Sequence, residues 1–171
     1  WRESGAEVVE IAEAPTGGPD LGQLEAALIA AGDALKVGTF SAASNVTGMR
    51  SPTREIARLL HAHDAYACFD YAASAPYVEI DMNPPRDPDG GDPTIDAIFL
   101  SPHKFLGGPG SSGVLVFNER LYQRELPPSV GGGGTVDYVS PIDQDFIADI
   151  EEREKAGTPG VLQTLKAALA L

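Results

Sequence analysis

Short apolar segments alternate with helix-length amphipathic segments along this 171-residue chain. A strand, a helix and a second strand in succession form the βαβ unit, whose two strands lie parallel in one sheet. The middle apolar segment, AYACFD, is apolar at nearly every position, which is typical of a strand covered on both faces. The alternation therefore predicts an α/β fold, a mostly parallel sheet flanked by helices. The expected strands are residues 6–12, 34–41, 65–70, 96–101 and 113–117, and the expected helices are residues 20–33 and 51–64.

Capping residues mark the ends of the expected helices. Asp20 has the side chain of an N-cap, and Gly32 lies near the end of the same helix. In the second helix, Ser51 is the expected cap and Pro52 the first helical residue. The inward apolar stripe of that helix consists of Ile56, Leu59 and Leu60. No helical segment separates the last two strands, so we expect that pair to be antiparallel.

The acidic composition narrows the functions to consider. The chain has 25 acidic and 12 basic residues, a formal net charge of −13. Nucleic acids and anionic membranes are bound by clustered Lys and Arg, so neither is expected as a partner. We interpret the charge as a solubility feature rather than as adaptation to high salt. With 43% hydrophobic residues, the chain has enough apolar material for one domain with a buried core.

The two ends of the sequence look like cuts in a longer protein. The chain begins at Trp1 instead of an initiator Met, and it ends within a helical pattern, TLKAALAL. We therefore expect residues 1–171 to be part of a larger domain, and no targeting signal can be read. No apolar run is long enough to span a bilayer.

Three further features each have two interpretations. Residues 83–93, NPPRDPDGGDP, show the Asp-x-Asp-Gly spacing of a calcium loop, but the later Glu is missing, which favours a solvated turn. The tetraglycine at 131–134 is either a flexible linker or close-packed backbone. Cys68 lies in an apolar strand, which predicts a buried inert thiol rather than a nucleophile. As the single cysteine, it excludes a disulfide framework within the chain.

Polar side chains follow the carboxyl ends of three consecutive expected strands. Asn45 lies in a loop of small residues after strand 34–41, and Asp70 ends strand 65–70. Strand 96–101 leads into Ser101, His103 and Lys104. Each residue also has a structural explanation, such as a turn, a cap or a satisfied loop histidine. Ligands bind beyond the carboxyl ends of parallel strands, however, so the set as a whole predicts a binding site.

The run SPHKFLGGPGSSG places a scarce amine before several glycines. A Lys amine forms an imine with an aldehyde, and pyridoxal phosphate supplies an aldehyde, a pyridine nitrogen and a phosphate. An Asp beside the nitrogen keeps it protonated, so the ring withdraws electrons from a substrate's α-carbon. Ser and His can bond the phosphate, and glycines let the backbone approach it. A nucleotide P-loop is excluded, because its glycines precede the Lys and a helix follows.

The segments SNVTG, DYAASAP, SPHKFLGGPGSSGVLVF and REKAGTP together resemble the class V aminotransferase family, which includes cysteine desulfurases and selenocysteine lyases. The resemblance covers most of the chain. It implies the middle of the large domain of a fold-type I pyridoxal-phosphate enzyme, without its N-terminal segment and C-terminal small domain. The complete enzyme would be a cytoplasmic homodimer acting on an amino acid or amine, as a transaminase or as a cysteine desulfurase or lyase. The 171 residues alone would be inactive.

The resemblance also implies roles for individual residues. Lys104 would form the Schiff base with pyridoxal 5'-phosphate and shuttle the proton at the α-carbon. Asp70 would pair with the pyridine nitrogen, Ala72 would pack beneath the ring, and Asn45 would lie near the ring hydroxyl. The phosphate would be bound by Ser101 and His103 and, across a dimer interface, by Thr158.

One position departs from the family pattern. Gln or His often stands three residues after the Asp and bonds the ring hydroxyl, whereas this chain has Ala73. Either Asn45 and a water compensate, or the cofactor's electronic properties differ. Two alternatives therefore stay open: a catalytically degenerate binding module, and an α/β domain that binds another phosphorylated metabolite with Lys104 as a counter-charge. The sequence does not distinguish transamination, desulfuration, β-elimination and racemisation.

Overall fold

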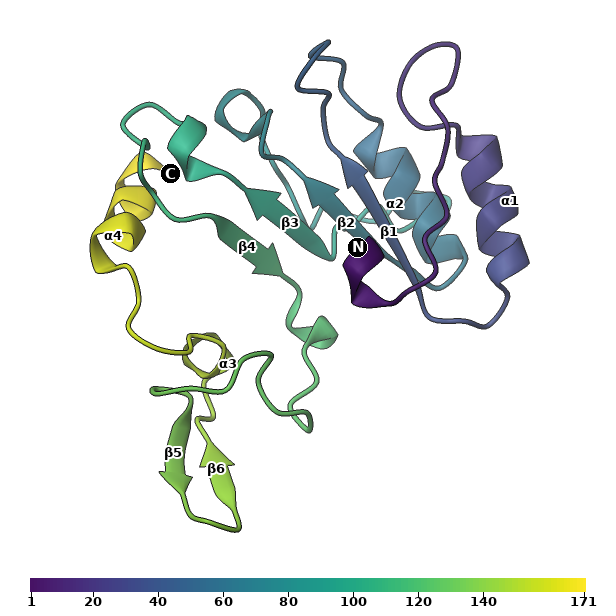
Figure 1. Cartoon of the computed structure of the whole chain (residues 1–171). Helices are drawn as coiled ribbons and strands as arrows, with labels where there is room; N and C mark the ends of the chain where they lie inside the picture. The colour runs from purple at the N-terminus through teal and green to yellow at the C-terminus, as the bar shows by residue number, and fades with distance from the viewer.

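The computed structural model describes residues 1–171 and contains a four-stranded sheet (Figure 1). Its strands, in spatial order, are β1 (Lys36–Ser41), β2 (Ala65–Asp70), β3 (Ala97–Leu100) and β4 (Val114–Phe117). Strands β1, β2 and β3 are parallel, and β4 is antiparallel to β3. The predicted mostly parallel α/β sheet and its antiparallel last pair are therefore confirmed.

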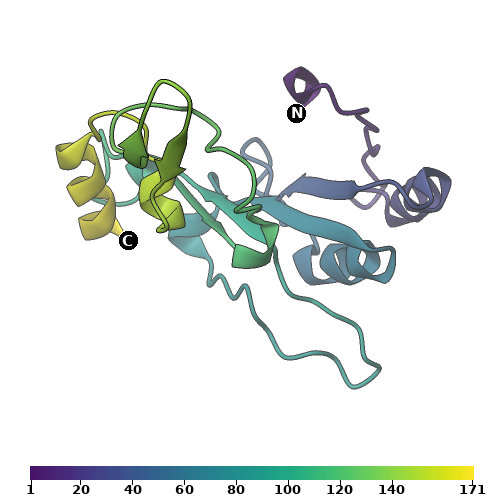
Figure 2. The same ribbon diagram turned by 90° about the horizontal axis from the view of Figure 1, so that it is seen from below.

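Two helices cover one face of this sheet. Helices α1 (Leu21–Ala31) and α2 (Thr53–Ala62) lie on the same side of the strands, as Figure 2 shows from below. Gly38 in β1 lets α2 approach closely, because a Cβ at this position would overlap the Leu60 side chain. The residues that pack between helices and strands are apolar and buried, and they include Leu28, Ile56, Leu60, Phe69 and Ile98. The predicted stripe of α2 thus faces the core, with Leu59 at its partly buried margin.

The two helices begin in different ways. Asp20 caps α1 by accepting a 3.0 Å hydrogen bond from the backbone N–H three residues later, and Gly32 ends the helix, as predicted. Helix α2 begins one residue later than predicted, because Pro52 is its N-cap and no side chain caps it. The Ser51 hydroxyl instead donates to the Ser41 carbonyl at 2.6 Å. The Ser51 hydroxyl, which the sequence predicts as the cap of α2, therefore bonds to the end of β1 instead.

Residues 6–12 form no strand, and the prediction for this segment was wrong. The segment is mostly exposed, and the hydrogen bonds at its end do not belong to a ladder. The Ala12 N–H donates to the Gln23 side chain at 2.6 Å, and the Ala12 carbonyl accepts from the Asp20 N–H at 2.9 Å. A β-branched sequence becomes a strand only where a partner strand and packing favour it, and here the turn before α1 binds the backbone instead.

The C-terminal part of the chain adds a hairpin and two helices. Strands β5 (Val136–Val139) and β6 (Gln144–Phe146) are antiparallel and lie apart from the main sheet (Figure 1). Helices α3 (Ile150–Arg153) and α4 (Val161–Ala170) follow. No helix has both the length and the hydropathy needed to cross a membrane. Short 3₁₀ helices span Arg2–Ser4, Ala75–Tyr77, Pro102–Lys104 and Glu119–Leu121.

The tetraglycine segment is exposed, but two of its residues are held against the chain between α3 and α4. The Gly133 carbonyl accepts a 2.8 Å hydrogen bond from the Gly157 N–H. A Cβ at Gly132 would lie 3.2 Å from the Ala156 Cβ, tighter than ordinary van der Waals contact. Glycine is therefore suited to position 132, where the backbone packs against the chain between α3 and α4.

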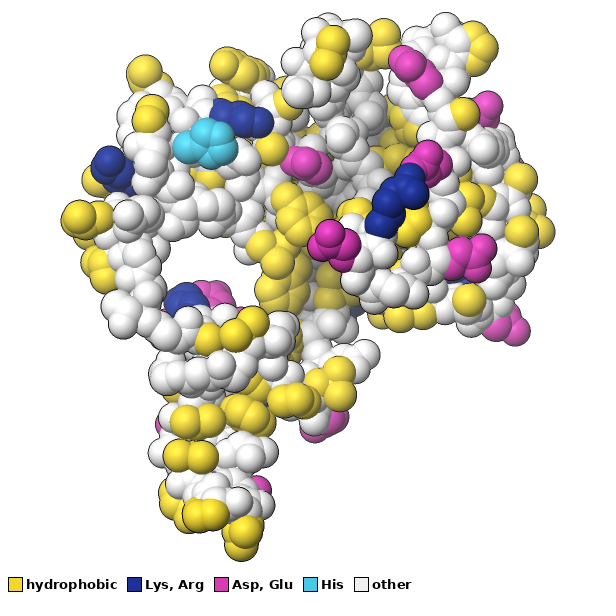
Figure 3. Space-filling view, viewed as in Figure 1, with side chains coloured by type: hydrophobic (Ala, Val, Ile, Leu, Met, Phe, Trp, Pro, Cys, Tyr) yellow, Lys and Arg dark blue, Asp and Glu magenta, His cyan; other side chains and the backbone are white.

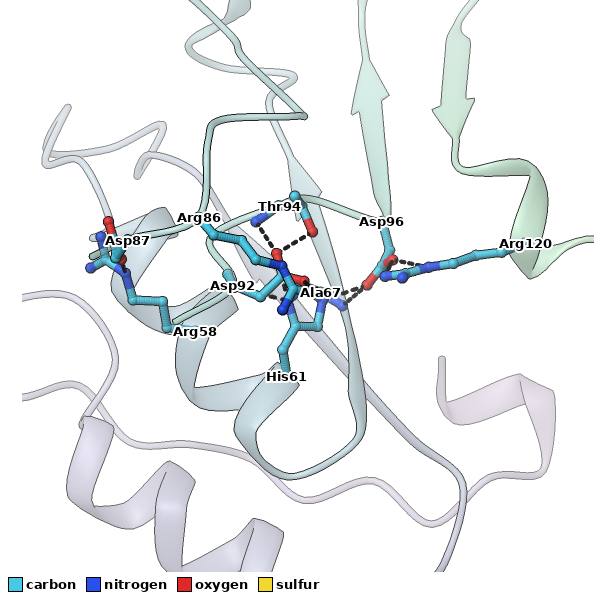
Figure 4. A network of polar contacts seen from close by, with 9 residues as sticks. All are labelled: Arg58, His61, Ala67, Arg86, Asp87, Asp92, Thr94, Asp96 and Arg120. Carbon is cyan, nitrogen blue, oxygen red and sulfur yellow. Dashed lines mark hydrogen bonds and ion pairs between the residues drawn. The ribbon is translucent and has the colours of Figure 1, made fainter. Parts of the chain in front are cut away.

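A buried polar network braces the amino ends of the strands (Figure 4). The fully buried Asp96 carboxylate accepts hydrogen bonds from the Ala67 N–H at 2.8 Å, His61 Nε2 at 2.9 Å and Arg120 Nε at 3.0 Å. The hydrogen bond to Asp96 raises the pKa of His61 above its ordinary value, although burial opposes this shift. Burial also disfavours ionised Asp96, but its three donors hold the pKa of Asp96 below the usual range. Asp96 directly precedes β3, so the network joins α2, β2 and β3 to the segment after β4.

The second face of the sheet carries apolar side chains that α1 and α2 do not cover. Val37 and Leu115 are 45% and 53% exposed, and Figure 3 shows an apolar strip across the middle of the molecule. Cys68 shares this face with Val37 but is buried. Burial, followed by the nearby Asp96 charge, raises the pKa of the Cys68 thiol to about 11. The thiol is therefore neutral at neutral pH, in agreement with the predicted inert side chain.

Candidate active site

The carboxyl ends of the parallel strands open onto one cavity. Strand β1 ends at Ser41 and β2 at Asp70, and these residues are register partners. Strand β3 leads through Ser101 into the short helix Pro102–Lys104. The cavity at this edge has a volume of about 730 Å³, within the rough range of 300–1,000 Å³ for small-molecule sites. The predicted site residues that line it are Asn45, Asp70, Ala72 and Lys104, together with Ala73.

Asp70 presents a carboxylate whose backbone is fixed on both sides. Its carbonyl accepts from the Ala42 N–H at 2.8 Å, and the next residue, Tyr71, donates to the Phe99 carbonyl at 3.0 Å. Its side-chain Oδ1 accepts from the Ala72 N–H at 2.7 Å. Asp70 takes part in none of the ion pairs of the chain. Its charge is therefore available to a ligand in the cavity.

Asn45 stands on a tight turn that comes after β1. The Ser44 N–H donates to the Met49 carbonyl at 2.9 Å, and the Ser44 carbonyl accepts from the Gly48 N–H at 2.9 Å. Gly48 has φ +72°, a conformation that L side chains rarely adopt. The structural explanation of Asn45 as a turn residue is thus correct, and the same turn places it on the cavity wall.

Lys104 ends a 3₁₀ helix that the glycine run packs against. The Lys104 N–H donates to the Ser101 carbonyl at 2.9 Å, which closes the turn. The Gly108 N–H donates to the Phe105 carbonyl at 3.0 Å, and a Cβ at Gly108 would overlap the Pro102 carbonyl. The glycine is needed because the loop folds directly back onto the helix that carries Lys104. Lys104 lines the cavity and, like Asp70, is in no ion pair.

Three predicted phosphate-binding residues do not line this cavity. Ser101 is half-buried and directly precedes the 3₁₀ helix, and His103 is exposed. Thr158 is exposed in the connection between α3 and α4. The structure therefore brings together the residues expected around the cofactor ring but not those expected around its phosphate.

Several wall residues were not among the predicted site residues. Ser41 lines the cavity from the last position of β1, and the strand-end argument that selected Asp70 applies to it equally. Glu13 and Met49 also line it. Glu13 belongs to the turn before α1, whose position over the cavity depends on tertiary folding and leaves no local signal in the sequence.

No group of three or more His, Cys, Asp or Glu side chains is arranged to hold a metal ion. In the polar segment 83–93, the Asp89 side chain accepts from the Gly91 N–H at 3.0 Å, as in a solvated turn. The segment thus forms the turn that the sequence predicts.

Comparison with known proteins gives consistent matches. The sequence profile of the family described as aminotransferase class-V matches residues 1–171. A probable cysteine desulfurase of Staphylococcus epidermidis is 33% identical over 141 residues, which cover 81% of this chain and 31% of the relative. Probable cysteine desulfurase 2 of Mycobacterium leprae is 30% identical over 151 residues, which cover 88% of this chain and 34% of the relative. The chain thus spans about a third of the length of these relatives.

Solved structures share the fold. The apo cysteine desulfurase of Thermococcus onnurineus NA1 matches with a TM-score of 0.74 at 25% identity, over 96% of this chain and 38% of that chain. The Escherichia coli cysteine desulfurase CsdA matches with a TM-score of 0.73 at 24% identity, over 99% of this chain and 39% of that chain, a likeness of fold alone. The expected fold-type I architecture is confirmed. Because the family profile matches the entire sequence, the chain belongs to the aminotransferase class-V family.

Proposed function

We propose that this chain is the cofactor-binding mid-section of a larger enzyme that uses pyridoxal 5'-phosphate to act on an amino acid or amine. The reaction would be of the transaminase type or of the cysteine desulfurase and lyase type. Membership of the class V family and relatives named cysteine desulfurases support the class of enzyme. The greater length of those relatives supports the mid-section, and we expect the 171 residues alone to be inactive.

One observation carries the proposal: Lys104 and Asp70 line the same cavity, and neither is neutralised by an ion pair within the chain. Pyridoxal phosphate carries its aldehyde and its pyridine nitrogen at opposite ends of one flat ring. A cavity with an amine and a free carboxylate on its wall therefore fits this group. When bound, the cofactor withdraws electrons from the substrate's α-carbon and so makes its bonds easier to break.

Each residue around the ring would have its own task. The Lys104 amine would hold the cofactor at its aldehyde and would move the proton to and from the substrate's α-carbon. The Asp70 carboxylate would pair with the ring nitrogen and favour its protonated form, because an adjacent negative charge favours the charged form. Ala72 offers a small surface beneath the ring, and the Asn45 amide serves the ring hydroxyl.

The phosphate contacts complete the proposal. Ser101, which precedes the 3₁₀ helix of Lys104, and His103, which lies within it, would bind the phosphate at the rim of the cavity. Thr158 lies outside the cavity of its own chain, so we propose a homodimer in which Thr158 of a second copy reaches the phosphate. A cytoplasmic location belongs to the same proposal, and the free thiol of Cys68 fits a reducing compartment.

The test compares two lysine variants of the intact protein with added pyridoxal 5'-phosphate. Lys36→Ala is the matched control. Lys36 lies at the amino end of β1, away from the cavity, and its Nζ donates to the Gly32 carbonyl at 2.5 Å. We expect the visible absorbance band of the covalently bound cofactor in the wild type and in Lys36→Ala, and its loss in Lys104→Ala. No band in the wild type, or a band of full intensity in Lys104→Ala, would refute the proposal.

Ala73 favours a second candidate function. It lines the cavity, and its side chain offers no hydrogen bond to the ring hydroxyl. A catalytically degenerate binding module would show the absorbance band but no transaminase or lyase turnover. A domain that binds another phosphorylated metabolite would show no band, since a counter-charge at Lys104 forms no covalent bond.

A further inference from the structure

Ser41, the last residue of β1, lines the cavity but has no role among the proposed cofactor contacts. Ser41 and Asp70 are register partners of the parallel pair, and both line the cavity. We propose that the Ser41 hydroxyl donates a hydrogen bond to the Asp70 carboxylate and so orients it toward the cofactor's ring nitrogen. This inference rests on the proposed function, and Ser41 is a positioning residue because it acts through Asp70.

The structure shows no hydrogen bond between the Ser41 and Asp70 side chains, but their positions in register allow one to form. Register partners on neighbouring parallel strands project their side chains from the same face of the sheet, and such strands are roughly 4.8 Å apart. At that separation, rotation about the side-chain torsions alone brings a serine Oγ and a carboxylate oxygen to hydrogen-bond distance. No movement of the backbone is required.

The backbone on either side of this contact is held in place. The Ser41 carbonyl accepts from the Ser51 hydroxyl at 2.6 Å, and the Ala42 N–H donates to the Asp70 carbonyl at 2.8 Å. The first bond ties the end of β1 to the start of α2, and the second ties it to β2. Ser41 is therefore presented to Asp70 from a rigid strand end, as a residue that orients another side chain requires.

The carboxylate has the acceptor capacity for this donor. Oδ1 of Asp70 accepts from the Ala72 N–H at 2.7 Å, which leaves Oδ2 for further partners. Each carboxylate oxygen has two acceptor sites, so Oδ2 can accept from Ser41 and still face the ring nitrogen. Held at one oxygen, the carboxylate swings about its side-chain bond, whereas a second donor fixes its plane. A donor also favours the charged carboxylate, so a proton shared with the ring stays on the nitrogen.

The test uses the intact protein loaded with pyridoxal 5'-phosphate that carries ¹⁵N in its ring. The nitrogen chemical shift reports where the shared proton lies, a property that a purely structural role of Ser41 would not change. Ser41→Ala and Ser41→Val remove the hydroxyl, and Ser41→Thr restores it in nearly the shape of Val. Thr39→Val is the control, because Thr39 shares the face of β1 with Ser41 but pairs with Cys68 and lies outside the cavity.

We expect the wild type, Ser41→Thr and Thr39→Val to give the shift of a protonated nitrogen. In Ser41→Ala and Ser41→Val, the shift should move toward that of the unprotonated nitrogen. The Kd of the cofactor should rise on the order of 10-fold, the usual effect of losing one hydrogen bond to a charged group. An unchanged shift in both variants, or a Ser41→Thr variant that behaves like Ser41→Val, overturns the inference and leaves the proposed function standing, because the visible band persists. A wild type without that band overturns both.

Discussion

Replacing Asp96 with Asn tests how the sheet is braced at the end opposite the cavity. Asn keeps the size of the side chain but removes its charge and replaces one acceptor oxygen with an NH₂ donor. The buried carboxylate accepts from the Ala67 N–H at 2.8 Å, from His61 at 2.9 Å and from Arg120 at 3.0 Å. In Asp96→Asn at least one of these three donors faces another donor. Arg120 loses its counter-charge, and so does His61 when it is protonated.

Burial sets the size of the effect. Removing one partner of a buried ion pair costs about 3–5 kcal/mol, because the remaining charge is left uncompensated. The Arg120 side chain is 49% exposed and can turn toward water, which reduces its share of the cost. His61 is only 12% exposed and cannot turn toward water, so it either keeps an uncompensated charge or loses its proton. We therefore expect Asp96→Asn to lower the free energy of unfolding by about 3 kcal/mol, a large part of the ~5–15 kcal/mol typical of a domain.

Urea denaturation followed by circular dichroism measures this loss as a lower midpoint at unchanged slope. Asp89→Asn is the matched control, since Asp89 is exposed and its side chain accepts only from the Gly91 N–H at 3.0 Å. The control should change the stability by less than about 0.5 kcal/mol. An Asp96→Asn midpoint equal to that of the wild type would show that the network does not stabilise the fold.

Three further predictions concern other parts of the molecule. Because the pKa of His61 is raised in the folded state, its contribution to stability is complete below the unfolded pKa of about 6.5 and is lost as pH rises through the folded pKa. Urea midpoints should fall as the pH rises from the unfolded pKa through the folded pKa, and His61→Gln should abolish the fall; an unchanged profile would contradict the assignment. Gly108→Ala should cost about 1–3 kcal/mol in the same assay and weaken the cofactor band, because the added Cβ overlaps the Pro102 carbonyl and displaces Lys104. Cys68, with its pKa raised to about 11, should react with a thiol reagent far more slowly in the folded protein than in urea, and equal rates would disprove its burial.

Local sequence patterns were sufficient where an element's own residues decide its structure. Strand β2 begins and ends as predicted, at residues 65 and 70, because its apolar run is bounded by polar residues on both sides. The prediction failed for residues 6–12, because a strand needs a partner that the local pattern does not reveal. Helix α2 starts one residue later than predicted for a similar reason: the Ser51 hydroxyl bonds to the Ser41 carbonyl instead of capping the helix.

Some residues of the candidate site could be predicted from local sequence patterns, and others depend on tertiary folding. Asp70 and Asn45 were found because the carboxyl ends of parallel strands, and the loops after them, lie at one edge of the sheet. The wall formed by residues 11–13 depends on how the turn before α1 folds over that edge, so no motif marks it. Ser41 was overlooked although it ends a predicted strand, since a serine at a strand end gains meaning only from its register with Asp70.

Borohydride reduction of the intact protein with pyridoxal 5'-phosphate, combined with peptide mass spectrometry, tests most directly whether the Lys104 amine bonds to the cofactor in the cavity it shares with Asp70. The peptide that contains Lys104 should gain the mass of the reduced cofactor, and the peptides that contain the other three lysines, Lys36, Lys155 and Lys166, should not. A stable adduct on one of those three lysines, or none on any, would contradict the proposed function.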